Sequence, residues 1–396
     1  MQVTHIGDDR RDEWNAFVAQ EPCFALLQSW EWGEFKEQLG WKAFRVAVER
    51  QGQIIAGAQM LIRPLPLEVA SLAYVPRGPV GDWLDNEATL HLLLPALHQV
   101  ARQHRAILLK IEPSLCNESS ACQALQHYGF RASHYTNQPR ATLILDLTTD
   151  LDDILRHMRK KTRQYIRSAV RQGVTVREGD QDDLPAFYDL MRMTGHRRHF
   201  PVRARDYYMH QWQTFAGKGQ MVLLMAFHQD RLLSARTIFA LGTHAAEFQA
   251  GASAEYQHLR PNYLLVWEAI KWAKAHGCHT YDLWGIPDEI GQAVHDGNDL
   301  PEREHSDGLW GVYQFKRGFS KNVVCYPSAY DQVYLWPLYR LVAKARLNTR
   351  SRLDRVAVGL DLLRRSSRRI SAPAGLSVSH GKTPYVPAPT TVVPSD

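Results

Sequence analysis

The feature that most constrains the fold is a pattern of elements that occurs twice along the chain. Residues 43–63 form two apolar runs on either side of a polar turn, and residues 221–241 repeat this arrangement. Apolar runs joined by a short polar turn predict a β-hairpin. In each half a helical stretch follows, at 88–104 and at 262–276, and after it an apolar strand, at 107–111 and at 280–286.

Two prolines support this repeat, because each closes the last strand of its half. Pro113 and Pro287 lie 174 residues apart, and the two hairpins are offset by nearly the same distance. A constant offset between equivalent elements indicates a duplicated unit. We therefore expect an α/β fold with two mixed, mostly antiparallel sheets, in which each hairpin is followed by a helical crossover.

The chain length agrees with two units, because 396 residues exceed the ~250 that one hydrophobic core usually organises. We place the boundary where a strand at 141–147 ends and an acid-capped helix begins. Residues 1–147 are then the first lobe and 148–319 the second. Residues 346–396 are first basic and then rich in Ser and Pro, which predicts a disordered tail, although its arginine-rich part could instead contact anionic lipid.

Composition narrows the class of protein. The net charge of +6 and the pI near 9.0 favour anionic partners such as phosphates, nucleic acid or an anionic membrane face. No apolar run approaches the ~20 residues that span a bilayer, and the first residues do not resemble a signal peptide. Five scattered cysteines without a CxxC pair suit a reducing compartment. We expect a cytoplasmic protein without disulfides or a zinc site.

Six segments resemble the Fem family of nonribosomal peptidyltransferases. They occur in order over roughly residues 25–330 and read QSWEWGEFK (28–36), YVPRGP (74–79), QPRAT (138–142), KTRQYIR (161–167), RPNY (260–263) and GLWGVYQFKRGF (308–319). The resemblance implies two tandem GNAT-like lobes, with residues from about 320 to 345 returning to complete the first. Some members carry a long helical arm, but only about a dozen residues separate the Tyr207-Tyr208 helix from the strand at Met221, so this chain resembles the short form.

The resemblance also implies a reaction. An aminoacyltransferase of this family moves an amino acid from aminoacyl-tRNA to an amine on the stem peptide of a peptidoglycan precursor, in interpeptide bridge synthesis. The precursor could be UDP-MurNAc-pentapeptide or lipid II, and the sequence leaves this open. We expect a monomer with possible peripheral contact with the inner membrane face, and no DNA partner.

An aminoacyl ester is already activated, so its transfer requires mainly a positioned amine and stabilisation of the oxyanion that forms. The sequence shows no convincing nucleophile elbow or catalytic triad. We therefore expect no cofactor, no metal and no covalent enzyme intermediate.

Three residues are expected to bind the precursor. In the resembling family the lysine that matches Lys36 touches a diphosphate, a role that suits a compact point charge. An arginine and a tyrosine spaced like Arg203 and Tyr207 bind the same diphosphate and the sugar-peptide portion. Without the surrounding motif, Lys36 would be an exposed helix lysine, and Arg203 and Tyr207 would belong to an ordinary surface helix.

Three further residues are expected near the reacting groups. Tyr256 lies in the loop before the helix at 262, where a GNAT-like fold opens its acceptor groove, and we assign it to substrate contact. Phe315 and Lys316 follow what we interpret as a glycine-flanked aromatic strand. The lysine that matches Lys316 in the family is thought to stabilise developing charge or to receive the tRNA end, so Lys316 is our first candidate for a catalytic residue.

A basic segment is a candidate tRNA contact. Seven Lys or Arg residues occur within residues 156–171, a composition that suits a phosphate backbone but is also typical of a solvated helix. The possible contacts are Lys160, Lys161, Arg163 and Arg167.

Two other functions remain open. A GNAT-type acyl-CoA N-acyltransferase, for example in exopolysaccharide modification, would carry a Gln/Arg-x-x-Gly-x-Gly/Ala turn for the CoA pyrophosphate. Gln126 with Gly129 fails this pattern at Arg131, and Arg192 with Gly195 fails it at Arg197. A non-catalytic protein that binds the precursor or tRNA is the other alternative.

Overall fold

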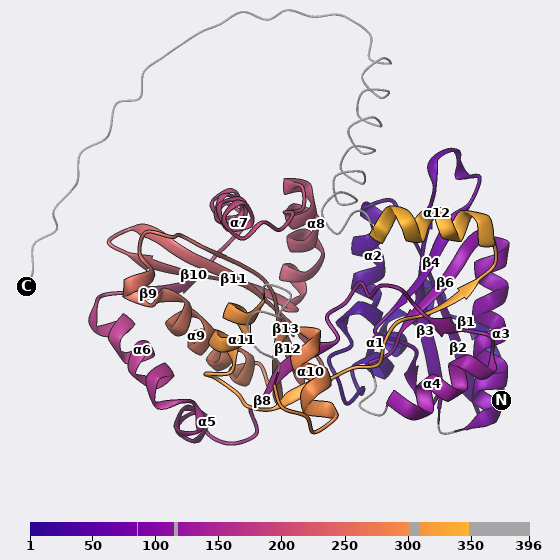
Figure 1. Ribbon diagram of the computed structural model, residues 1–396, viewed down its shortest axis with the longest axis horizontal. Helices are drawn as coiled ribbons and strands as arrows, with labels where there is room; N and C mark the ends of the chain where they lie inside the picture. The colour runs from indigo at the N-terminus through magenta and orange to yellow at the C-terminus, as the bar shows by residue number, and fades with distance from the viewer. Residues whose placement is uncertain (85, 115–117, 301–308, 348–396) are drawn as a thin grey trace, which may run out of the picture. The chain divides into compact units, whose positions relative to one another are not determined.

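The computed structural model describes residues 1–84, 86–114, 118–300 and 309–347. Within these ranges the chain forms two β-sheets, and each is covered by helices (Figure 1). We call the part around each sheet the first and the second lobe.

The first sheet has eight strands in the order β1-β2-β3-β4-β6-β15-β7, with β5 paired to β3. The bounds are β1 (Gln2–His5), β2 (Lys42–Arg50), β3 (Gln53–Pro64), β4 (Ser71–Pro76), β5 (Val80–Gly81), β6 (Ala106–Glu112), β7 (Arg131–Ala132) and β15 (Tyr330–Val333).

Helices pack on both faces of this sheet because successive strand residues point to opposite faces. One face packs against α3 through a cluster that includes Val46, Met60 and Leu94. The other packs against α1 and α2 through Trp14, Phe35 and neighbouring apolar side chains. The helices of this lobe are α1 (Arg11–Val18), α2 (Trp30–Gln38), α3 (Glu87–Gln103), α4 (Glu118–His127) and α12 (Trp336–Leu347).

The second sheet has seven strands in the order β14-β8-β13-β12-β11-β10-β9. The bounds are β8 (Ala141–Asp146), β9 (Thr175–Glu178), β10 (Met221–His228), β11 (Arg231–Leu241), β12 (His244–Ala252), β13 (Thr280–Ile286) and β14 (Val323–Cys325).

The second sheet is likewise covered on both faces. A large cluster under α5, α6 and α9 fills one face, and a smaller one under α7 and α8 fills the other (Figure 1). The helices of this lobe are α5 (Leu151–His157), α6 (Lys160–Arg171), α7 (Leu184–Arg198), α8 (Arg205–Phe215), α9 (Pro261–Ala275), α10 (Asp288–His295) and α11 (Trp310–Lys316).

The two lobes repeat the same topology, which confirms the expected fold class. In the first sheet β2 and β3 form a hairpin, and α3 leads back so that β6 pairs in parallel with β4. In the second, β10 and β11 form the hairpin, and α9 leads back so that β13 pairs in parallel with β12. All other strand pairs are antiparallel.

The lobe boundary differs from the one expected at residue 147. Strand β8 pairs with β13 and β14 in the second sheet, because Leu143 and Leu145 are buried in the core of the second lobe. The second lobe therefore begins before β8. It also extends past 319 to β14, and only β15 then returns to the first sheet, between β6 and β7.

The segment between α8 and β10 holds a single 3-10 turn, Ala216–Lys218. At the C-terminal end, residues 346 and 347 belong to α12 instead of the expected tail. The rest of that tail, including its arginine-rich part, lies outside the described residues.

Candidate active site

Lys36 and Tyr207 come from different lobes and meet at one point. Helix α2 begins after Ser29, whose hydroxyl accepts a hydrogen bond from the Trp32 amide at 3.2 Å. Two turns later the Lys36 ammonium lies 4.9 Å from the Trp32 ring centre and 5.7 Å from that of Tyr207 on α8. The Arg203 guanidinium lies 5.8 Å from the same Tyr207 ring. The structure thus brings together the three residues expected to bind the precursor.

The charge of Lys36 is sensitive to this setting. Burial among rings, and then the positive charges of Arg203 and Arg63, lower the pKa of Lys36 to about 7. The guanidinium groups of Arg203 and Arg63 lie beside the Lys36 amine, which loses its proton near neutral pH. Together these groups form a region that attracts anions. A diphosphate bound there would favour the charged form of Lys36, since an opposite charge stabilises the ammonium group.

Lys316 lies in a different environment, buried in the second lobe with 8% of its surface exposed. Its ammonium group donates hydrogen bonds to the carbonyl oxygens of Trp284, at 3.2 Å, and Gly285, at 2.9 Å. An ammonium group has three N–H donors, and these bonds use two of them. The nearest Glu247 carboxylate oxygen is 3.8 Å away.

Opposing effects set the charge of Lys316. Burial lowers its pKa to about 8, the Glu247 carboxylate acts against this, and the Arg236 guanidinium adds to the lowering. Arg236 donates a hydrogen bond to Glu247, and both side chains are buried. Lys316 is therefore mainly charged at neutral pH and is buried, and in a site that excludes water a hydrogen-bond donor stabilises an oxyanion more strongly than it would in water.

A row of aromatic rings links the two lysines. Trp32, beside Lys36, makes an edge contact with Phe248 at 6.0 Å between ring centres. Phe248 in turn lies 4.3 Å from the ring of Trp284, whose carbonyl accepts from Lys316. Because these three rings join the first lobe to the second, the two lysines lie at the ends of one half-buried aromatic path.

Two predicted residues lie away from this path. Phe315 packs on Tyr263 and Phe319 in the apolar core of the second lobe, at 4.9 and 5.2 Å between ring centres. Tyr256 accepts a hydrogen bond from Arg231 at the start of β11. Neither contact joins these two side chains to Lys316 or Lys36.

The expected strand before Phe315 is wrong, because residues 310–316 form helix α11. Its buried side chains, Tyr313 and Lys316, are three residues apart, a spacing that places both on one face of a helix.

The basic segment is a helix, α6, with different roles along it. Lys160, Lys161 and Arg167 are exposed. Arg163 instead donates to the carbonyls of Arg156 and Met158, at 2.8 and 2.6 Å, and so caps the end of α5. Three of the four proposed tRNA contacts are thus available to a large polyanion, and Arg163 is engaged within the protein.

Sequence reasoning missed Arg236, Glu247, Asp282 and Trp284, which surround Lys316. A signal was available for the first three, since each is a charged residue inside a mostly apolar strand, and such residues are rarely buried unless paired. Trp284 carried no such signal, because its role comes from its backbone and ring contacts.

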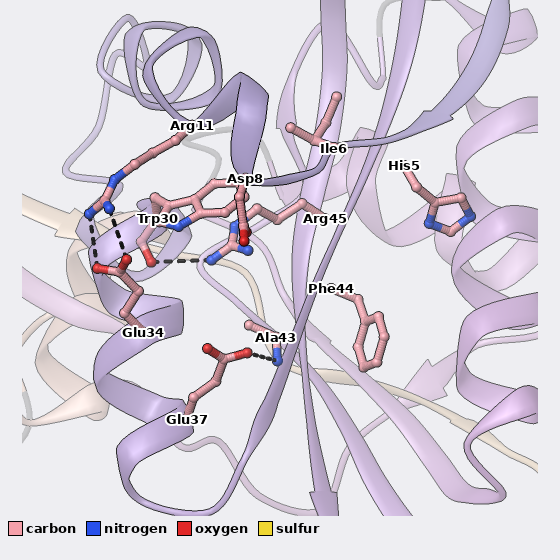
Figure 2. A pocket seen from close by; sticks show the side chains of 10 residues that line it. All are labelled: His5, Ile6, Asp8, Arg11, Trp30, Glu34, Glu37, Ala43, Phe44 and Arg45. Carbon is pink, nitrogen blue, oxygen red and sulfur yellow. Dashed lines mark hydrogen bonds and ion pairs between the residues drawn. The ribbon is translucent and has the colours of Figure 1, made fainter.

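A separate pocket of about 410 Å³ lies in the first lobe (Figure 2). Arg45 stacks on the Trp30 ring there, at 3.4 Å from its centre, and Arg11 pairs with Glu34. None of the residues predicted for the site lines this pocket. The lining residues are His5, Ile6, Asp8, Arg11, Trp30, Glu34, Glu37, Ala43, Phe44 and Arg45.

The sequence model of the FemAB family matches residues 10–232 and 226–344. The chain belongs to the FemAB family. This confirms the resemblance seen in the six segments. Among relatives of this FemAB-family chain, the lipid II:glycine glycyltransferase of Staphylococcus aureus (strain MRSA252) is 25% identical over 421 residues, which cover 87% of this chain and 96% of the relative.

Solved structures support the fold of this FemAB-family chain. A crystal structure of FemX has a TM-score of 0.75 and 24% identity, covering 87% of this chain and 100% of that one. A tandem GNAT protein from the clavulanic acid biosynthesis pathway has a TM-score of 0.52 and 11% identity, covering 84% of this chain and 98% of that one. At these identities the likeness establishes the fold alone.

The described ranges lack two features, a membrane-spanning helix and a metal-binding cluster. None of their helices is both long enough and apolar enough to cross a bilayer. Nor do their His, Cys, Asp and Glu side chains form a group of three or more that could hold a metal ion.

Proposed function

We propose that this protein transfers an amino acid from aminoacyl-tRNA to an amine on the stem peptide of a peptidoglycan precursor, in interpeptide bridge synthesis. Membership of the FemAB family supports this reaction class. So does the relative named lipid II:glycine glycyltransferase, whose length this chain spans almost completely.

The observation that carries the proposal is the pair of lysines at the two ends of the aromatic path. Lys36, with Arg203 and Tyr207, offers positive charge and an aromatic face for the diphosphate and sugar of the acceptor. Lys316, fixed by two carbonyls, offers a hydrogen-bond donor within a buried site. Acceptor binding and catalysis are thereby assigned to separate groups.

The chemistry requires little from the protein beyond this arrangement. The acceptor amine attacks the ester carbonyl carbon, and the electron pair of the C=O bond moves to oxygen. An N–H group of Lys316 stabilises that oxyanion. As the intermediate collapses, the amide bond forms, the ester C–O bond breaks, and the amine loses a proton while the departing ribose oxygen gains one.

Donor binding is assigned to exposed cations of the second lobe. Lys160, Lys161 and Arg167 on α6 would contact tRNA phosphates, since backbone contacts dominate binding to RNA helices. Tyr256 and Phe315 are retained as proposed contacts in the same lobe. We propose that the protein acts as a monomer, and that a lipid-linked acceptor would bring it to the inner membrane face.

The test supplies the full-length protein with a bacterial pool of charged tRNA and either UDP-MurNAc-pentapeptide or its lipid-linked form. Mass spectrometry of the product should show one added aminoacyl residue, and the mass difference identifies the amino acid. A parallel reaction replaces charged tRNA with acyl-CoA. Acyl transfer from acyl-CoA, with no aminoacyl addition to either acceptor, would overturn the proposal.

A further inference from the structure

The carboxylate of Glu247 is buried beside Lys316 without a role in the reaction described above. Glu247 lies on β12 with 5% of its surface exposed. It accepts a hydrogen bond from Arg236 on β11 and a longer one, of 3.4 Å, from the Tyr281 hydroxyl on β13. Its second oxygen lies 3.8 Å from the Lys316 ammonium on α11.

We propose that Glu247 is a positioning residue that keeps Lys316 positively charged and holds its ammonium group against the carbonyls of Trp284 and Gly285. The inference deepens the proposed function and rests on it for the reaction. The geometry that supports it does not depend on which amino acid is transferred.

The balance of buried charge points to Glu247. The buried charged groups that act on Lys316 are the cation Arg236 and the carboxylates of Glu247 and Asp282, and the Tyr281 hydroxyl faces Glu247. Asp282 also faces the Arg77 guanidinium and acts on Lys316 less strongly than Glu247 does. Glu247 has the larger effect on Lys316 while it also pairs with Arg236, and a buried charge without compensation is costly.

The backbone at Trp284 provides the second half of the arrangement. Strand β13 is irregular between Asp282 and Gly285, and Trp284 has φ of 62°, a left-handed conformation that a bulky residue rarely adopts. This turn directs two successive carbonyl oxygens at one ammonium group. Strained backbone persists only where its surroundings fix it, and it is frequent at functional sites.

A purely structural role for Glu247 predicts something different. In that case the Arg236–Glu247 ion pair would only hold β11 against β12, and the titration of Lys316 would not depend on it. The pH at which Lys316 loses its proton therefore separates the two roles.

The decisive measurement needs no substrate. Full-length protein is labelled with ¹³C-lysine, and its lysine side-chain resonances are followed by NMR against pH, with that of Lys316 assigned by its absence in K316M. In E247Q the titration midpoint of Lys316 should move to lower pH. A midpoint equal to that of the wild type would overturn the proposal.

Activity gives the second readout, with KM and kcat measured from pH 6 to 9. In E247Q the KM for the acceptor should stay near the wild-type value. The kcat should fall by a factor that grows with pH, reaching about tenfold for each pH unit by which the midpoint moves. A kcat ratio that is constant across the pH range contradicts a role in keeping Lys316 charged.

The first lobe offers a matched control. Asp331 is fully buried and lies 2.8 Å from the Lys110 ammonium, so D331N also removes a buried carboxylate beside a lysine. It should destabilise the fold without moving the Lys316 midpoint. A similar shift in D331N would show that any loss of buried charge has this effect, and it would count against the proposal.

The conservative variant E247D provides a second test if E247Q does not fold. E247D keeps the charge but withdraws the carboxylate by one methylene, so the Lys316 midpoint should again move down, by less than in E247Q. No change would overturn the proposal. A wild-type protein that transfers no amino acid would instead refute the proposed function, whatever the titration shows.

Discussion

At the scale of single residues, the site depends on two lysines whose surroundings assign them different tasks. Lys36 lies among aromatic rings beside Arg203, where a bound anion would favour its charged form. Lys316 lies against carbonyl oxygens and a carboxylate, where its position is fixed before any substrate arrives. In the proposed reaction, Lys36 thus serves to recognise the acceptor, and Lys316 serves to stabilise the developing charge.

Replacing Lys316 tests the second task. We expect K316M to lower kcat by about 100-fold or more, because one oxyanion donor is lost, and to leave acceptor binding near the wild-type value. Single-turnover transfer and isothermal titration with the acceptor measure the two effects. The neighbouring exposed lysine gives the control variant K321M, which should behave as the wild type. A loss of binding with unchanged kcat in K316M would reverse the assignment.

Replacing Lys36 tests the first task. K36M should weaken acceptor binding and affect kcat much less. In the wild type, affinity should fall as pH rises through about 7, because Lys36 loses its charge there. Titrations with UDP-MurNAc-pentapeptide between pH 6 and 8.5 measure this, and in K36M the dependence should flatten. The exposed Lys42 supplies a control, since K42M should keep both the affinity and its pH dependence.

The sequence singled out three residues that lie together around Lys36, but it missed those around Lys316. Lys36, Arg203 and Tyr207 belong to recognisable segments and meet in space. Glu247 and Asp282 were missed, because their partners lie on neighbouring strands, and the register of that pairing cannot be read along the sequence. Tyr256 was placed correctly in its loop, but its hydroxyl contacts Arg231.

At the scale of elements, α2 depends on close approach to the first sheet. Its Gly33 faces β2 and β3, where an added Cβ would lie 2.5 Å from Oε1 of Gln59 and would also overlap the Arg45 guanidinium. Neither neighbour can move easily. Arg45 is stacked on Trp30, and the Gln59 amide donates to the carbonyls of Leu27 and Ser29.

A pair of glycine substitutions tests this packing. G33A should destabilise the protein by about 1–3 kcal/mol, as overpacking of a filled core usually does. G311A in α11 is the matched control, because no atom of the described residues lies within 4 Å of the added Cβ, and it should be neutral or stabilising by up to ~1 kcal/mol. Urea unfolding of both variants measures the difference, and equal stabilities would contradict the packing argument.

The elements themselves were largely predictable. Both hairpins, both crossover helices and both parallel strands lie where the periodicity placed them. The exception was α11, where aromatic residues between glycines look like a strand. Its buried residues follow helical spacing, but that becomes visible only once the core that they fill is known.

At the scale of the whole molecule, a buried acid joins the two lobes. Glu31 on α2 accepts hydrogen bonds from Arg11, at 2.7 Å, and from Lys218 of the second lobe, at 3.2 Å. Burial raises the pKa of Glu31, but these partners outweigh it and lower the pKa to about 2. Because the folded-state pKa is depressed, this stabilisation is present at neutral pH and is lost as pH falls from about 4.5 to 2.

Removing this charge should lower stability at neutral pH. We expect E31Q to reduce the free energy of unfolding at pH 7 by about 3 kcal/mol, the value that corresponds to the displaced pKa. Near pH 2 the two proteins should be nearly equal in stability. Urea unfolding at several pH values measures this. A difference in stability that stays constant with pH would indicate that altered packing causes the effect, and not the loss of the Glu31 charge.

The position of strand β15 affects the order in which the two lobes can complete their folding during synthesis. It lies between β6 and β7, although about 200 residues of chain separate it from them. While the ribosome is still synthesising the second lobe, β6 therefore has an unpaired edge that could pair with other chains. The first lobe to be translated is the last to be finished, so its hydrophobic core needs protection during most of translation.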